Sequence, residues 1–258
     1  MTPSQRAEAR SRAYALLAGL WIEGLTEARL SAVQQTPLAG ALPDQIDLDL
    51  LAAAHHRATS MELLPYAGVF LDTDDTMGGA AQRFFTDSRT TGFHPDTTNT
   101  RADHLGLLLA WLAFLCGAEA DALEDGMGET AARVVTLQQD ALDRHLLSWL
   151  PPLWAAGRRS LRGFWAAVLD MTAAVILDHR GDVAAPPPLP DSAAGLLDAP
   201  KTSVWRIAGA LSTPATSGVF LTRVDLRVLG RAAGVPRGFG ARQQMIANLL
   251  RNAAEYQS

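Results

Sequence analysis

The sequence predicts an all-α protein: a compact helical bundle followed by a proline-rich linker and a helical C-terminal extension. Apolar residues recur at intervals of three and four along most of the chain, as they do on the buried face of a helix. No comparable stretch alternates apolar and polar residues with a period of two, the pattern of a half-buried strand. The 258 residues are 48% hydrophobic and 19% charged, so the chain has enough apolar surface to form a globular core.

The first predicted helix lies at the N-terminus, after the basic residues Arg6, Arg10 and Arg12. Glu8 lies within this basic stretch and no small-residue cleavage site follows, which argues against a secretory signal. Its apolar positions keep the helical spacing: Tyr14, Leu17, Leu20, Trp21 and Leu25. We therefore expect a core helix and a cytoplasmic protein.

Three further apolar stripes predict helices in the middle of the chain. The first contains the longest apolar run, Leu105 to Ala118, whose fourteen residues fall short of the ~20 that a membrane-spanning helix needs. We expect it to be buried, without stable membrane insertion. A looser stripe runs from Val134 to Leu150, and the most regular one from Leu161 to Ile176. Short connections are predicted at Pro37 and Pro43, Asp72 to Gly79, Gly92 to Thr100, and Pro151 with Pro152.

The stretch from Arg180 to Pro200 contains five prolines, whose missing amide donors and fixed φ angles exclude a helix. It divides the chain into a predicted body (1–180), a linker (181–200) and a helical segment packed on the body (201–258). Residues 1–200 carry a formal charge of −11 and residues 201–258 carry +6. An acidic body suits a basic, apolar partner and repels nucleic acid.

Two alternative functions, a metal-dependent hydrolase and a DNA-binding regulator, rest on local sequence patterns. The pairs Asp103-His104 and His55-His56 are possible ligands of a helical metal-dependent hydrolase, although no His-Glu-x-x-His or phosphate-binding loop is present. A lone cysteine, Cys116, provides no thiolate cluster and is typical of a reducing compartment.

The basic C-terminal segment resembles a helix-turn-helix, which makes a DNA-binding regulator the second alternative. Val224 to Ala233 and Arg242 to Leu250 would be its helices, joined by a turn at Gly234. We expect the apolar residues of this segment to be used in packing instead, among them Leu226, Leu229 and Ile246.

Several segments occur in an order that points to one family: Arg12–Ala18, Glu62–Leu71, Met77–Gly79, Phe84–Phe85, Ala102–Gly106 and His145–Pro151. Over roughly residues 10–180 this order resembles the TorD/DmsD/NarJ family of cytoplasmic chaperones, which mature molybdenum-containing oxidoreductases. Thr216 to Tyr256 resembles the ending of a longer branch of that family. Ala102 stands where the family usually has proline, and Leu108 where an acidic residue is common.

The resemblance implies a chaperone with the TorD-like fold, not an enzyme, and no cofactor of its own. Its partners would be the twin-arginine leader and the apo catalytic subunit of a molybdopterin oxidoreductase. It would delay twin-arginine export of that subunit while molybdopterin guanine dinucleotide is inserted. A leader of this kind joins a short basic stretch to an apolar helix, so its receptor needs carboxylates beside an apolar groove. The linker permits exchange of segments between protomers, so both a monomer and a domain-swapped dimer are compatible with it.

The candidate peptide-binding residues on the matched motifs are Glu62, Pro65, Tyr66, Phe70, Asp103, His104, Leu105 and Trp149. Glu62 and Asp103 would pair with the leader's arginines, and Tyr66, Phe70 and Trp149 would contact its apolar part. Structural roles are open for some of them: Asp103 can cap the following helix, and Phe70 and Trp149 can belong to the core. His104 can bond to a peptide carbonyl, or join two helices by a hydrogen bond.

Overall fold

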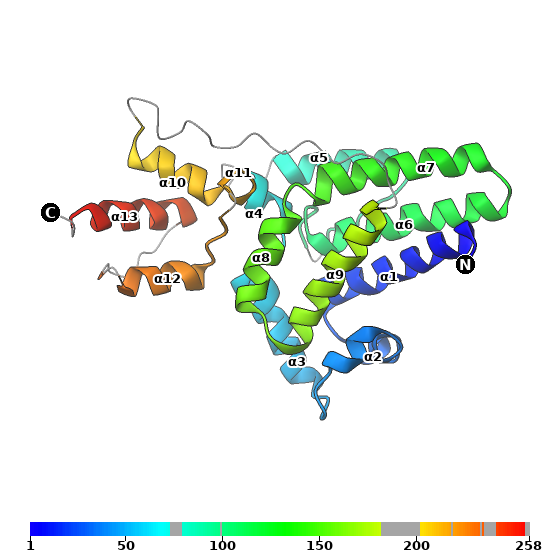
Figure 1. The fold of residues 1–258 in the computed structure, drawn as a ribbon, viewed down its shortest axis with the longest axis horizontal. Helices are drawn as coiled ribbons and strands as arrows, with labels where there is room; N and C mark the ends of the chain where they lie inside the picture. Colours follow the sequence, from blue (N-terminus) through cyan, green and yellow to red (C-terminus); the bar gives the residue numbers. More distant parts are fainter. Residues whose placement is uncertain are drawn as a thin grey trace.

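The computed structural model describes residues 1–72, 79–98, 100–181, 202–217, 219–232, 234 and 241–255. Every regular element within these ranges is helical, which confirms the predicted all-α class (Figure 1). The helices are α1 (Pro3–Glu23), α2 (Glu27–Gln34), α3 (Leu48–His56), α4 (Ala67–Leu71), α5 (Gly79–Thr90), α6 (Leu105–Glu124), α7 (Gly128–Asp140), α8 (Leu150–Ser160), α9 (Gly163–Gly181), α10 (Val204–Ser212), α11 (Pro214–Ser217), α12 (Arg223–Ala232) and α13 (Arg242–Glu255). The chain also forms one 3-10 helix, η1 (Pro37–Ala41), and two π-helical turns, η2 (Arg57–Glu62) and η3 (Ala141–Leu146), within the described residues. The predicted linker lies outside the described residues, apart from Gly181.

Helix α6 forms the centre of the body, between α1 and α7 (Figure 1). By length and composition alone it could cross a membrane, but 67% of its most apolar stretch is buried within the protein, as in a core helix. Helix α1 packs closely against α6 at Gly106, where an added Cβ would lie 2.9 Å from the carbonyl oxygen of Ala18. The glycine therefore allows the two backbones to approach.

A chain of buried polar side chains joins four helices inside the apolar core. The Tyr14 hydroxyl lies 3.0 Å from His179 Nδ1, and His179 Nε2 lies 3.0 Å from Gln138 Oε1. The Gln138 amide group donates to Glu119 Oε2 (2.9 Å) and to the Leu115 carbonyl (3.2 Å). Because the Gln138 oxygen can only accept, His179 must carry its proton on Nε2 in this network. The network ties α1, α6, α7 and α9 together.

Two of the predicted stripes correspond to α6 and α9, with α9 beginning at Gly163 rather than Leu161. The looser stripe from Val134 to Leu150 spans α7, η3 and the start of α8 instead of one helix. The prediction that Pro151 and Pro152 mark a connection is wrong, because both lie in the first turn of α8. Amide donors in a first turn have no partner within the helix, so proline costs nothing there.

The helices α10 to α13, called here the C-terminal unit (residues 202–255), have a small core of their own. Its fully buried members are Ala208, Leu226, Ile246 and Ala247. In Figure 1 this unit lies at the end of the molecule opposite the α6–α7 turn. Leu229 remains 45% exposed, so the expectation that it is used in packing is wrong.

Candidate functional site

Five of the eight candidate residues meet where two chain segments run antiparallel, ahead of α4 and α6. The Leu105 amide donates to the Pro65 carbonyl (2.8 Å), and the Ala67 amide donates to the Asp103 carbonyl (2.9 Å). These two bonds place Tyr66 opposite His104. The bridge joins motifs that are almost forty residues apart in the sequence, and it sets the positions from which both helices start.

Asp103 is fully buried at this junction and acts on α4, not on its own helix. Its Oδ2 accepts the Gly68 amide of the first turn of α4 at 2.8 Å. Arg101 contacts both carboxylate oxygens at 3.2 Å. The carboxylate thus satisfies an amide donor that α4 cannot satisfy internally.

His104 is the residue that caps α6. Its Nδ1 accepts the Gly106 amide at 3.1 Å, so the ring is neutral with its proton on Nε2. The edge of the ring packs against Tyr66 at 4.9 Å between centroids. Burial, as the larger cause, and the nearby His55 together lower the pKa of His104 to about 4. The cap requires the same neutral form that burial favours.

We expect His104 to make folding stability depend on pH. Its pKa falls from 6.5 to about 4 on folding, so between these values the unfolded chain binds a proton that the folded chain excludes. The contribution of His104 to the free energy of unfolding is therefore complete above pH 6.5 and is lost as the pH falls toward 4. The total loss is on the order of 3 kcal/mol, because a shift of one pKa unit corresponds to about 1.36 kcal/mol. Urea unfolding of the protein and of His104→Asn at pH 7, 5.5 and 4.5 measures this.

Asparagine also caps helices well but does not titrate in this range, so the variant should lose less stability on acidification than the original protein. His55 and His145, whose pKa values are also lowered by burial, are present in both proteins and cancel in the difference. Parallel stability curves for the two proteins would contradict the assignment.

Glu62 and Tyr66 are the candidate residues that retain solvent access on either side of a sharp reversal of the chain. Leu64 adopts φ 50°, an unusual conformation for a non-glycine residue, and the Tyr66 amide donates to its carbonyl at 2.7 Å. The Arg101 guanidinium lies 5.3 Å from the Tyr66 ring centroid. Glu62 makes no side-chain hydrogen bond or ion pair with the described residues, and its neighbour Met61 is 59% exposed. The reversal therefore presents a carboxylate next to apolar surface.

Phe70 and Trp149 lie inside the protein, away from solvent. Their rings are 5.3 Å apart, and the Trp149 indole donates to the His145 carbonyl at 2.6 Å. Phe220 of the C-terminal unit covers Phe70, with the two rings stacked at 4.5 Å. Sequence reasoning did not identify this partner, because no local pattern relates Phe220 to α4.

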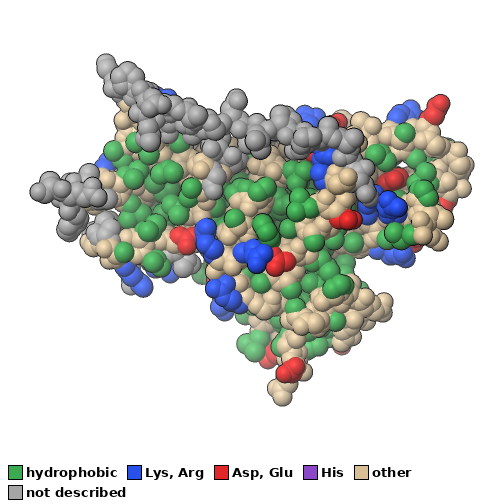
Figure 2. Space-filling view, viewed as in Figure 1, with side chains coloured by type: hydrophobic (Ala, Val, Ile, Leu, Met, Phe, Trp, Pro, Cys, Tyr) green, Lys and Arg blue, Asp and Glu red, His purple; other side chains and the backbone are tan. Residues whose placement is uncertain are grey.

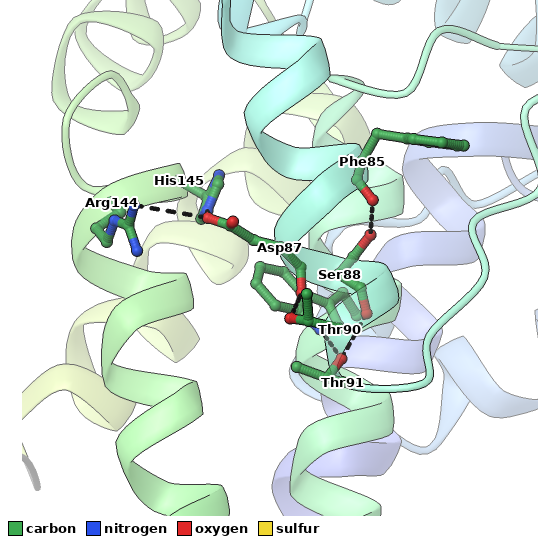
Figure 3. A network of polar contacts seen from close by, with 8 residues as sticks. Phe85, Asp87, Ser88, Thr90, Thr91, Arg144 and His145 are labelled. Atoms are coloured by element: carbon green, nitrogen blue, oxygen red, sulfur yellow. Dashed lines mark hydrogen bonds and ion pairs between the residues drawn. The ribbon is translucent and has the colours of Figure 1, made fainter.

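His145, which opens the last matched motif, joins η3 to α5. Its Nε2 lies 2.9 Å from Asp87 Oδ2, and Arg144 approaches the same oxygen at 3.7 Å (Figure 3). Burial lowers the pKa of His145, although Asp87 acts in the opposite direction. Among the described residues, no three His, Cys, Asp or Glu side chains are grouped so that they could hold a metal ion.

An open apolar groove between α1, η1 and α9 was not predicted from the sequence. Its volume is about 710 Å³, and its walls are mostly apolar, with the carboxylates Asp170 and Asp178 on the α9 side and the guanidinium groups of Arg6 and Arg10 on the α1 side. Asp170 accepts the Trp154 indole N–H at 2.7 Å. The sequence feature that could have indicated this groove is a pair of small residues, Ala9 and Ala13, four positions apart on a face of α1 outside the predicted apolar stripe.

Comparison with known proteins gives one result. Residues 37–155 match the sequence model of the family described as nitrate reductase delta subunit. The match includes every candidate residue from Glu62 to Trp149. No curated protein and no solved structure matches the chain significantly.

Proposed function

We propose that this chain, whose residues 37–155 match the nitrate reductase delta subunit family, is a member of that family and a cytoplasmic chaperone that binds the twin-arginine leader of a molybdopterin oxidoreductase. The family consists of chaperones that mature molybdenum-containing enzymes. The chain would hold the apo catalytic subunit competent for insertion of molybdopterin guanine dinucleotide and delay its export. It would perform no catalysis itself.

One observation carries the location of the proposed binding site. The matched motifs, distant in sequence, converge on the junction of α4 and α6, where the chain reversal presents Glu62 and Tyr66 to solvent. A carboxylate of this kind pairs with guanidinium groups through charge-assisted hydrogen bonds. Tyr66 and the exposed Met61 provide the apolar contact that the rest of a leader needs.

The other candidate residues support this surface from behind. Asp103 and His104 cap the helices that flank it, and Pro65 and Leu105 form one bond of the bridge. Phe70 and Trp149 form its apolar base, with no exposed surface in this conformation. In the proposal these six residues position the binding surface. A ligand can contact Phe70 only if Phe220 moves away from it.

We expect Glu62→Gln and Tyr66→Ala each to weaken binding of a synthetic twin-arginine leader about tenfold, the equivalent of about 1.4 kcal/mol. One charge-assisted hydrogen bond or one aromatic contact is worth this much. Fluorescence anisotropy of a labelled leader measures the affinity, and circular dichroism shows that the variants remain folded. Glu129→Gln, the same charge change at the far end of the body on α7, is the matched control.

Asp178→Asn tests a second possible binding site for the leader, because the groove between α1 and α9 also has carboxylates beside apolar surface. If only Asp178→Asn weakens binding, the leader binds in that groove and the site proposed at Glu62 is wrong, whereas the function stands. If the folded protein binds no twin-arginine leader at all, the proposed function itself is refuted.

A further inference from the structure

Phe220 is the buried aromatic side chain by which the C-terminal unit contacts the body, and α11 also packs against α4 and α12 against η2. Phe220 is 3% exposed and is the member of this unit that belongs to the main apolar core of the body. Its ring stacks on Phe70 at an interplanar angle of 23°. Four other buried apolar residues of the unit pack on one another in the separate core described above. Phe220 thus fills a site on the body, while its own unit is held together without it.

Polar contacts bind the backbone next to Phe220. Arg159 of α8 donates to the Phe220 carbonyl at 2.8 Å and lies 3.5 Å from Asp225. From the other side, Arg242 of α13 lies 4.5 Å above the Phe220 ring and donates to the Val69 carbonyl of α4. Figure 2 shows basic and acidic side chains gathered where α8 meets the C-terminal helices. A carbonyl bound by arginine and an aromatic ring on an aromatic base are the contacts by which a peptide is recognised.

We propose that Phe70 and Arg159, with Trp149 behind them, form a peptide-binding socket that the chain's own segment 219–222 occupies until the leader of a client displaces it. This inference rests on the proposed function. The socket is continuous with the proposed site, because Phe70 lies on α4, which starts directly after Tyr66. Helix α12 also contacts η2, which ends at Glu62.

Segment 219–222, Val-Phe-Leu-Thr, is itself uncharged and mainly apolar, and it lies within the basic part of the chain. Residues 201–258 carry a charge of +6 against −11 for the rest of the chain, and they present a phenylalanine flanked by arginine. A twin-arginine leader is likewise basic and apolar. Release of segment 219–222 exposes the apolar base at Phe70, whereas the core of the C-terminal unit stays buried. The body therefore offers this surface only to a ligand that competes with the docked segment.

The first test uses the full-length chain and a labelled synthetic peptide covering residues 217–226. Phe220→Ala should bind this peptide, because the socket is empty of its aromatic occupant, whereas the unaltered protein should not. A peptide with alanine in place of its phenylalanine should bind neither protein. Absence of peptide binding to folded Phe220→Ala would overturn the proposal, since the contact would then be only structural.

The second test measures the twin-arginine leader on the same proteins. The leader can bind only those molecules in which the socket is free, so its apparent affinity is the intrinsic affinity multiplied by their fraction. We therefore expect Phe220→Ala to bind the leader at least ~10-fold more tightly. Val228→Ala, which alters an exposed residue of α12 outside segment 219–222, should leave the affinity unchanged. Unchanged leader affinity in Phe220→Ala would refute the competition.

Asp225→Asn keeps the test valid if Phe220→Ala does not fold. Asp225 lies outside the socket, accepts hydrogen bonds from the Thr222 amide and hydroxyl, and lies 3.5 Å from Arg159, so its loss weakens the docking of segment 219–222, and leader affinity should rise in the same direction. Unaltered affinity in this folded variant would count against the proposal. If segment 217–226 binds Phe220→Ala but no protein binds the leader, the socket stands and the proposed function fails.

Discussion

Gly106→Val is expected to destabilise the protein by more than about 4 kcal/mol, a large part of the 5–15 kcal/mol that holds a typical domain together. Even the first added carbon would overlap the Ile22 side chain and lie 2.9 Å from the Ala18 carbonyl oxygen. The side chain of Ile22 can move, but the backbone of α1 cannot retreat without breaking its packing along α6. Thermal and urea unfolding followed by circular dichroism measure the loss.

Gly117→Ala on the same helix is the matched control. A Cβ at this position would meet only the Ser11 hydroxyl at 3.5 Å, an ordinary contact. Alanine also favours a helix by about 1 kcal/mol over glycine, so this variant should be as stable as the original protein or more stable. If Gly106→Val unfolded at the same urea concentration as Gly117→Ala, the close approach of α1 and α6 would be wrong.

Gln138→Leu is expected to cost about 3–5 kcal/mol, because it removes hydrogen bonds from three buried polar groups at once. Glu119 and the Leu115 carbonyl each lose a hydrogen bond from the Gln138 amide group, and His179 Nε2 loses its acceptor. The substitution adds no bulk, so the loss reports the hydrogen bonds. Urea unfolding at pH 7 gives the free energy of unfolding.

Gln139→Leu, one residue further along α7, removes the same amide from a partly exposed position, where we expect a change within about 0.5 kcal/mol. A loss below about 1 kcal/mol in Gln138→Leu would mean that the network does not hold the four helices together. The second comparison, Gln138→Glu, places two carboxyl groups in contact with each other and should also destabilise the protein at neutral pH.

Much of the fold could be predicted from the sequence, because helices are specified by neighbours three and four residues apart. The stripes of α1, α6 and α9 were predicted from spacing alone, and Tyr14, Leu17 and Trp21 are buried as expected. The prediction failed at Pro151, where the same residue type serves either a connection or a first helical turn. Local sequence does not distinguish these two uses of proline.

The candidate site was predictable only as a set of motifs. Spacing predicted Asp103 as a possible cap of the helix that follows it, whereas the structure gives that role to His104 and uses Asp103 to bind the first turn of α4. The partner of Asp103 is the amide of Gly68, thirty-five residues earlier in the chain. Such a partner depends on how two segments are brought together, which periodicity does not describe.

The sequence by itself determined the helical class, the buried faces of the main helices and the similarity of residues 37–155 to the nitrate reductase delta subunit family. These properties are encoded locally, in the spacing of apolar residues and in the order of short motifs. Only the tertiary structure decided that the motif carboxylate Asp103 is buried while Glu62 stays accessible, and that Phe220 covers Phe70. Burial and pairing of this kind arise from contacts between residues distant in the chain, and they are set by the packing of whole helices.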